Sequence, residues 1–218
     1  LASRPSSARD RNWRTSSHTG TEITGCTNQL REKMAVDKIG LFYGSDTGNT
    51  QFVAEKIGER IGLERIDLFD ISDVVISKIT EYTFLILGIP TWFDGELQGD
   101  WGDQFSGLDN LALTGKTIAL YGLGDQFGYD FYFLDALGIL ADKVESRGAP
   151  VVGEWPAAGY GPTESKAQRE AVFVGLALDT DHEPYLTEPR IDKWLEMIMP
   201  KFEATTANAV GQTTRMRT

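Results

Sequence analysis

The chain has 218 residues, of which 41% are hydrophobic, and this suits one medium-sized domain with short extensions. Its 32 acidic residues outnumber 21 basic ones and give a net charge of -11, which disfavours nucleic acid and favours a basic protein surface as partner. A single cysteine excludes an internal disulfide, and two histidines leave little for a His-based metal site. No apolar run approaches the ~20 residues that span a bilayer, so we expect no membrane insertion.

The first 36 residues differ in composition from the rest of the chain. They hold six basic and three acidic residues, are rich in serine, and show no sustained apolar periodicity. We expect a disordered or loosely docked arm over 1–36, similar in composition to an organelle transit peptide, which would place the protein in the chloroplast stroma. The alternative is a cloning or gene-boundary remnant, because Met34 can itself be a start, and it leaves a cytoplasmic location open.

The acidity belongs to the predicted domain, which we place over 37–203. A flexible tail is expected over 204–218, and it contributes only two basic residues. Between the arm and the tail, 13 basic residues face 29 acidic ones, a net charge of -16.

Residues 38–50 predict a strand, a tight polar loop and the start of a helix. The apolar run 39–43 favours a strand, Gly44 ends it, and from Gln51 onward apolar residues recur about every four positions. The first N–H groups of a helix have no partner inside it and carry the positive end of its dipole, so the loop 44–50 predicts an anion site. Because this loop holds no Lys or Arg, the site suits a single monophosphate.

The alternative is an ordinary turn between a strand and a helix, with Thr50 near the helix start. A P-loop is disfavoured, because Asn49 stands where the P-loop lysine would be and no earlier glycine has the required spacing.

Strands and helices alternate along the remaining chain. The pattern predicts a three-layer α/β/α sandwich around a five-stranded parallel sheet with right-handed crossovers. The stretch 154–172 interrupts the fifth strand. The second, third and fourth strands are expected over 64–69, 84–88 and 117–123. The fifth strand is expected to begin over 149–153 and to resume over 173–178. The further helices are expected over 71–78 (capped by Ser72), 97–105, 131–147 and 187–202.

Three loops with unusual residues follow strand ends, at 44–50, 88–96 and 122–130. In a doubly wound sheet such loops converge on the ligand site. Either Trp92 or Tyr129 alone would be ordinary rim packing, but the pair, on neighbouring loops above a phosphate site, favours a planar ligand stacked between them. The Gly-rich run 122–128 fails as a dinucleotide fingerprint, because its spacing is wrong and it follows the fourth strand.

Four motifs in order resemble the flavodoxin family, specifically its long-chain class of bacteria and algae, over about 37–203. They are SDTGNT, PTWFDGELQGDW, GLGDQFGYDFYFLDALGIL and VGLALDTD. The resemblance implies a flavodoxin-like sheet of order 2-1-3-4-5 and a tightly but noncovalently bound FMN that shuttles single electrons. The interruption at 154–172 is the feature that distinguishes long-chain members.

The resemblance also implies which residues bind the cofactor. The first loop would hold the phosphate, Trp92 and Tyr129 would cover the two ring faces, backbone around Gly124 would meet the pyrimidine edge, and Asp181 would reach the ribityl hydroxyls. The full set is Ser45, Asp46, Thr47, Gly48, Asn49, Thr50, Pro90, Thr91, Trp92, Phe93, Asp94, Gly95, Leu123, Gly124, Asp125, Tyr129 and Asp181.

Phe93 departs from the family, whose long-chain members often carry a small polar residue there, commonly Asn. The family's peptide at this place flips on reduction so that its carbonyl accepts a hydrogen bond from flavin N5–H. In this chain that peptide is Phe93–Asp94. A bulky Phe93 does not prevent the flip, but it can change what the flip costs and so change the stability of the semiquinone.

The expected function is that of a low-potential, monomeric one-electron carrier, not an enzyme, working between semiquinone and hydroquinone. The acidic body disfavours a further negative charge on the flavin and so lowers the second potential. The resemblance implies partners with basic docking surfaces, such as ferredoxin–NADP reductase and, in a photosynthetic cell, photosystem I.

Two other functions compete. An FMN-dependent NAD(P)H:quinone reductase on the same fold needs an open flavin face, which Trp92 and Tyr129 would cover. A signalling module of the receiver type needs an acidic cluster after the first strand, where Gly44 and Ser45 stand. His182, the only histidine in the domain, has no evident Ser or Cys partner for catalysis.

Overall fold

The computed structural model describes the backbone of residues 38–215 and the side chains of residues 38–203. These residues belong to a unit that runs from Asp37 to Thr218. The expected arm over 1–36 lies outside the described residues and stays a prediction.

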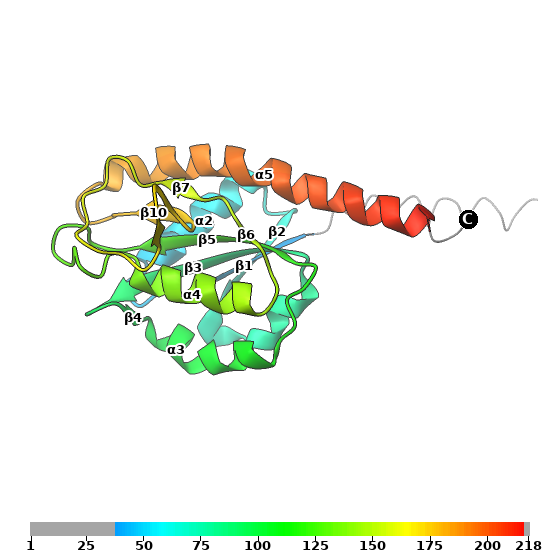
Figure 1. The fold of residues 1–218 in the computed structure, drawn as a ribbon, viewed down its shortest axis with the longest axis horizontal. Helices are drawn as coiled ribbons and strands as arrows, with labels where there is room; N and C mark the ends of the chain where they lie inside the picture. The colour runs from blue at the N-terminus through cyan, green and yellow to red at the C-terminus, as the bar shows by residue number, and fades with distance from the viewer. Residues whose placement is uncertain (1–37, 216–218) are drawn as a thin grey trace, which may run out of the picture. The chain divides into compact units, whose positions relative to one another are not determined.

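A parallel sheet forms the central layer, with α2 (Asn49–Ile61) and α5 (Pro184–Arg215) on one face and α3 (Gly99–Phe105) and α4 (Asp135–Ser146) on the other (Figure 1). The order β10-β5-β3-β1-β2 confirms the predicted order 2-1-3-4-5. The fifth strand is made of two short pieces that both pair with β5. These strands are β1 (Ile39–Tyr43), β2 (Ile66–Asp70), β3 (Phe84–Trp92), β5 (Thr117–Leu123), β6 (Val151–Val152) and β10 (Leu176–Leu178).

The inner strands form because helices cover both of their faces. Every residue of β1 and β5 is buried, which is why these strands read as continuous apolar runs in place of an alternating pattern. The helices bury a stripe at 3.6-residue spacing, and in α2 it comprises Val53, Ala54, Ile57 and Ile61. The predicted strands 39–43 and 117–123 are confirmed at both ends.

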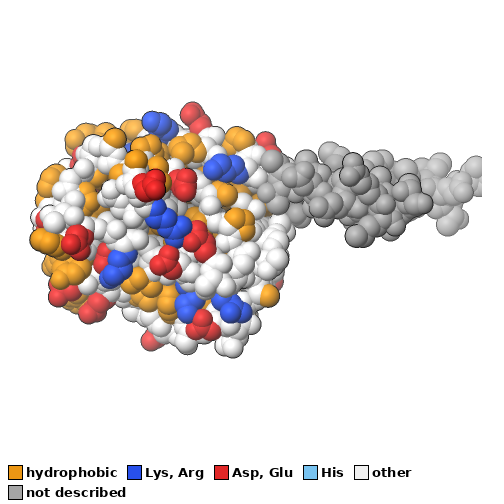
Figure 2. Space-filling model, viewed as in Figure 1, with side chains coloured by type: hydrophobic (Ala, Val, Ile, Leu, Met, Phe, Trp, Pro, Cys, Tyr) orange, Lys and Arg blue, Asp and Glu red, His pale blue; other side chains and the backbone are white. Residues whose placement is uncertain are grey.

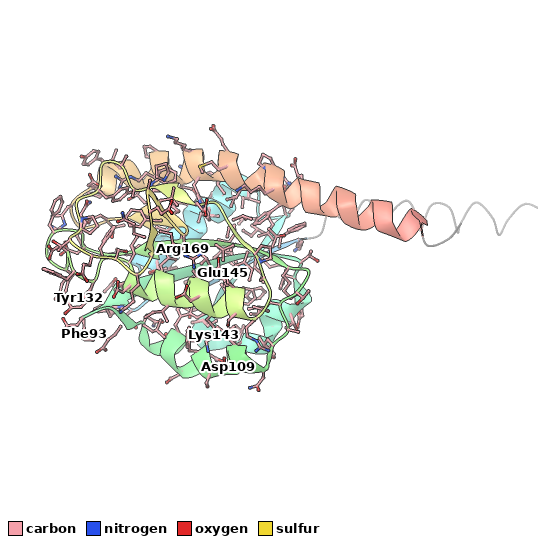
Figure 3. The ribbon with its side chains drawn as sticks, in the orientation of Figure 1. Phe93, Asp109, Tyr132, Lys143, Glu145 and Arg169 are labelled. Carbon is pink, nitrogen blue, oxygen red and sulfur yellow. The ribbon has the colours of Figure 1, made fainter. Side chains whose placement is uncertain are left out.

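The residues 153–175 between β6 and β10, which we call the insert, form a small antiparallel sheet of order β7-β9-β8. Its strands are β7 (Trp155–Pro156), β8 (Gln168–Arg169) and β9 (Val172–Phe173). The insert packs on the domain through Tyr160 and Phe173, whose rings lie 5.9 and 5.7 Å from that of Phe133. Arg169 pairs with Asp142 (2.9 Å) and Glu145 (2.7 Å) of α4, as Figure 3 shows for Glu145.

The short helix predicted over 71–78 is divided in the structure, and its predicted cap at Ser72 is wrong. Two 3-10 helices, η1 (Ile71–Asp73) and η2 (Ile76–Glu81), occupy this stretch, and another, η3 (Ser106–Asn110), follows α3. The cap is Asp70, whose carboxylate accepts a hydrogen bond from the backbone N–H of Ser72 at 2.9 Å. Val74 and Val75, two β-branched residues with extended backbone, separate the two 3-10 helices.

Other boundaries also differ from the prediction, among them those of the strands expected over 64–69 and 149–153 and of the helix expected over 97–105. The expected loop 88–96 begins as strand, because β3 continues to Trp92 along β5 and then pairs with β4 (Glu96–Leu97). Helix α4 begins at Asp135 and not at 131, because Leu134 has a left-handed φ of 62°. Helix α5 begins at Pro184 and continues to Arg215, through most of the expected tail. The flexibility of that tail stays a prediction.

Within the described residues, none of the helices combines the length and the apolar character that crossing a membrane requires.

Tyr121 ties the sheet to the start of α2. Its buried ring lies over Gly88 of the neighbouring strand, and its hydroxyl donates to the carbonyl of Thr50 at 3.1 Å. A Cβ on Gly88 would lie 2.0 Å from Cζ and 2.2 Å from Oη of this phenol. Burial raises the pKa of Tyr121 well above its usual value, so the hydroxyl keeps its proton and remains a donor.

We expect Gly88→Ala to lower the free energy of unfolding by about 1–3 kcal/mol, because the added methyl group must push the phenol off Thr50. Gly102→Ala, in α3 with nothing within 4 Å of the added carbon, is the control and should stabilise by up to about 1 kcal/mol. Urea unfolding of the three proteins measures both changes. Equal stability of Gly88→Ala and the parent would contradict this packing.

Candidate functional site

The carboxyl ends of β1, β3 and β5 open onto a cavity of about 260 Å³. It brings together thirteen of the seventeen residues that the sequence predicts, and adds Tyr132, Phe133 and Thr180. The thirteen are Asp46, Thr47, Asn49, Thr50, Pro90, Thr91, Trp92, Phe93, Leu123, Gly124, Asp125, Tyr129 and Asp181. The predicted convergence of the three loops is therefore confirmed.

The first loop leaves the start of α2 free of acidic or capping side chains. Gly48 is the N-cap, with a left-handed φ of 86°, and no side chain caps the helix from this position. The hydroxyl of Ser45 accepts the N–H of Gly48 at 3.1 Å and closes the loop. The first turn holds no acidic residue, so its unpartnered N–H groups are available to an anion beside Asn49 and Thr50.

Gln98, to which the sequence assigned no role, fixes this loop from behind. Its buried amide donates to Asp46 Oδ1 at 3.0 Å and accepts from the N–H of Trp101 at 3.2 Å. The indole of Trp101 in turn donates to the carbonyl of Gly88 at 2.9 Å. A Cβ on Gly44 would lie 2.2 Å from Gln98 Oε1, so only a glycine lets the loop pack directly on this amide.

One wall of the cavity is the end of β3 and the tight turn 92–95. The N–H of Gly95 donates to the carbonyl of Trp92 at 3.1 Å, and Phe93 has a φ of 43°, a left-handed value that costs energy for a side chain of this kind. The Phe93 side chain is 66% exposed. The indole Nε1 of Trp92 is buried and has no hydrogen-bond partner. A ligand that accepts this N–H would remove a penalty of about 1–3 kcal/mol.

The opposite wall is the loop after β5. The carboxylate of Asp125 accepts the N–H groups of Phe127 (2.9 Å) and Gly128 (2.7 Å), so it shapes the loop. The expectation that backbone, more than side chains, faces the ligand here stays a prediction. Tyr129, 49% exposed, stands at the rim.

The loop after β10 is organised by Asp179, a buried residue that the sequence analysis did not single out. Its carboxylate accepts the N–H of Asp181 at 3.1 Å and of His182 at 2.9 Å. The buried amide of Gln126 donates to Asp179 at 3.1 Å and accepts the N–H of Gly161 of the insert at 3.3 Å. Gln126 thus joins two loops of the cavity to the insert.

Four predicted residues do not line the cavity. They are Ser45, Gly48, Asp94 and Gly95. The hydroxyl of Ser45 accepts the N–H of Gly48, and Gly48 has no side chain to line the cavity. Asp94 is exposed, and Gly95 packs against Asp135. Their contact with a ligand stays a prediction. Tyr132 and Phe133 escaped the sequence analysis because their place, directly after the second aromatic loop, reads as the first turn of a helix.

Acidic and aromatic residues surround the cavity mouth. Among the described residues that line it, three are acidic and none is basic. Figure 2 shows hydrophobic and acidic side chains together at the left end of the domain, the end where Figure 3 labels Phe93 and Tyr132. The exposed aromatic side chains that line this cavity are Phe93, Tyr129 and Tyr132.

Comparison with known proteins agrees with this geometry. The family described as "Flavodoxin" matches residues 41–194. A flavodoxin of Picosynechococcus is 46% identical over 77% of this chain and 99% of its own length. A flavodoxin of Haemophilus influenzae is also 46% identical, over 73% of this chain and 92% of its own length.

Solved structures show the same arrangement of elements. A Fusobacterium nucleatum flavodoxin, described as bound to flavin mononucleotide, matches with a TM-score of 0.73 and 32% identity, over 76% of this chain and 99% of its own. Oxidised flavodoxin 1 of Bacillus cereus matches with a TM-score of 0.57 and 29% identity, over 74% of this chain and 97% of its own. With its interrupted fifth strand, the chain belongs to the flavodoxin family, in its long-chain class.

Proposed function

We propose that this chain binds FMN in the cavity and carries single electrons between redox partners. The observation that carries the proposal is one cavity that is lined both by an uncapped helix start and by aromatic side chains, Trp92 and Tyr129 among them. A phosphate and a planar ring system are the ligand features that this combination recognises, and FMN carries both. The Fusobacterium nucleatum structure, which holds flavin mononucleotide on the same fold, supports it.

The residues present fit FMN in two respects. A donor set made of backbone N–H groups with the side chains of Thr47, Asn49 and Thr50, without Lys or Arg, suits one monophosphate better than a di- or triphosphate. The buried, unpartnered Nε1 of Trp92 supplies a donor that an oxygen or nitrogen acceptor of the ligand would satisfy.

Bound FMN supplies the electron-transfer chemistry, and the protein tunes it. Asp46, Asp125 and Asp181 line the cavity of a domain that carries a net charge of -16, with 29 acidic against 13 basic residues. These carboxylates oppose the addition of negative charge and lower the second reduction potential, by ~59 mV for each 1.4 kcal/mol of repulsion. The backbone donors at α2 hold the phosphate without adding a compensating cation.

The same surface suits a redox partner with a basic rim and an apolar centre. The exposed aromatic side chains of Phe93 and Tyr129 line the cavity together with acidic residues, which would steer a basic protein toward the flavin. Ferredoxin–NADP reductase and photosystem I are the partners we propose for a photosynthetic cell. Cyanobacterial relatives support this choice, while an equally similar Haemophilus influenzae relative shows that the family extends beyond such cells.

A chloroplast location remains a proposal that rests on the composition of residues 1–36. Fractionation of the source cells, with N-terminal sequencing of the native protein, tests it.

We expect the purified protein to be yellow and to take up electrons in two separate one-electron steps during an anaerobic dithionite titration followed by visible absorption. A single two-electron bleaching, with rapid NAD(P)H-dependent turnover of a quinone, would favour the quinone reductase in place of the carrier. A colourless protein that does not bind added FMN would contradict the whole assignment.

FMN should bind the apoprotein at least about 100-fold more tightly than riboflavin. Two hydrogen bonds to a charged phosphate, at about 1.5 kcal/mol each, give about 3 kcal/mol, or roughly two powers of ten in Kd. Quenching of flavin fluorescence measures both constants. Added inorganic phosphate is the control, since it should weaken the binding of FMN and leave that of riboflavin unchanged. Equal affinities would place the phosphate outside the start of α2.

Phe93→Asn should stabilise the apoprotein by about 0.5–1 kcal/mol in urea unfolding. Asn tolerates a left-handed φ far better than Phe, a relief of about 1 kcal/mol or more, while the exposed ring gives up only a loose contact with Trp92, 6.0 Å between centroids. Phe131→Asn is the matched control, since Phe131 is also exposed but has no positive φ, and it should bring no gain. A destabilised Phe93→Asn would show that the ring contact outweighs the strain.

A further inference from the structure

Asp135, the first residue of α4, is a buried carboxylate behind the cavity. It is only 3% exposed, and its Oδ1 accepts the N–H of Lys166 at 2.8 Å. Its Oδ2 pairs with the ammonium of the same lysine at 2.6 Å. Lys166 belongs to the insert and its side chain is more than half exposed, so it is the part of the pair that reaches water.

The other side of this carboxylate lies against the turn 92–95. A Cβ on Gly95 would fall 2.7 Å from Oδ2 and 3.0 Å from Cβ of Asp135, so only a glycine backbone fits there. The next residue, Ala136, donates its N–H to the hydroxyl of Thr91 at 3.3 Å. The start of α4 therefore holds the turn on both sides, at Thr91 before it and at Gly95 at its end.

The insert is fastened to the same region by its segment 163–166. The hydroxyl of Thr163 donates to the carboxylate of Asp130, and the N–H of Glu164 donates to the carbonyl of Asp130 at 3.0 Å. Lys166 completes the segment by its pair with Asp135. A continuous set of contacts thus runs from the insert through Asp135 to the turn that carries Phe93.

We propose that Lys166 is a positioning residue, which holds the 92–95 turn in place through Asp135 and so tunes how this chain binds and reduces FMN. The inference rests on the proposed function. Without the ammonium, Asp135 would keep a buried negative charge with the backbone N–H of Lys166 as its donor, an arrangement that proteins relieve by moving the charge toward water. Gly95 packs directly on that carboxylate, so the turn moves with it.

A second cation of the insert provides a matched control. Arg169 pairs with Asp142 and Glu145 in the later turns of α4, away from the cavity (Figure 3). Like Lys166→Met, Arg169→Met removes one positive charge and the ion pairing of that residue with α4. Only the lysine variant breaks the contact that leads to Gly95.

The test compares Lys166→Met with Arg169→Met in the full chain. Lys166→Met should raise the Kd of FMN at least about tenfold and change the ratio of the two one-electron reduction equilibrium constants by at least about tenfold, in fluorescence and spectroelectrochemical titrations. Arg169→Met should change each by less than about threefold. Asp135→Asn combined with Lys166→Met removes the unpaired charge, and it should recover affinity relative to Lys166→Met alone.

Equal effects of the two single variants on Kd and on the reduction ratio would overturn the inference, since they would reflect the loss of any link to the insert. If Lys166→Met does not fold, as judged by far-UV circular dichroism, Lys166→Gln carries the same two measurements, because it also removes the ammonium and leaves the Asp135 charge in place, and both changes should have the same sign. A parent protein that binds no FMN refutes the proposed function itself. A parent that binds FMN, with Lys166→Met unchanged, refutes only the role of Lys166.

Discussion

The first turn of α2 is the point on which the site depends, because it offers the positive potential of the cavity without a charged side chain. Gly48 allows the chain to enter the helix with φ of 86°, and no acidic side chain competes for the N–H groups. Tyr121 holds the carbonyl of Thr50 from the sheet, and Gln98 holds Asp46 from the side of α3. Two hydrogen bonds, one of them fully buried, therefore fix the loop before any ligand arrives, which spares a ligand the entropy of ordering it.

An anion site without Lys or Arg is consistent with a low reduction potential. A cation in the first loop would hold a phosphate more tightly, but it would also stabilise negative charge on a reduced ring nearby and raise the potential. In this cavity the described lining residues include three carboxylates and no positively charged side chain. Backbone dipoles act over the first turn only, so they bind the phosphate with little effect on a more distant ring. The domain charge of -16 would act in the same direction on the potential, and it complements the basic partners proposed above.

Local chemistry was enough to predict the strand 39–43, the loop after it, the strand 117–123 and the aromatic pair Trp92 and Tyr129. What depended on distant segments was not predictable in this way. β3 extends to Trp92 because β4 and β5 supply its hydrogen bonds, and α4 starts late because Leu134 is left-handed. The residues that hold the loops of the cavity in place were not predicted, for the same reason. Gln98, Gln126 and Asp179 are ordinary polar residues in sequence, and their roles exist only through hydrogen bonds to loops up to 53 positions away.

The insert is best understood as the backing of the second aromatic loop. Its three hydrogen-bonded links with that loop and the start of α4 fall on Gln126, Asp130 and Asp135, a stretch that includes Tyr129 at the cavity rim. An exposed ring can cover a flavin face only if its backbone is held, because ordering a free loop would consume the stacking energy. Asp135 extends the same support across to Gly95 and the first aromatic loop. The interruption of the fifth strand thus places one polar segment where it can brace both walls of the cavity.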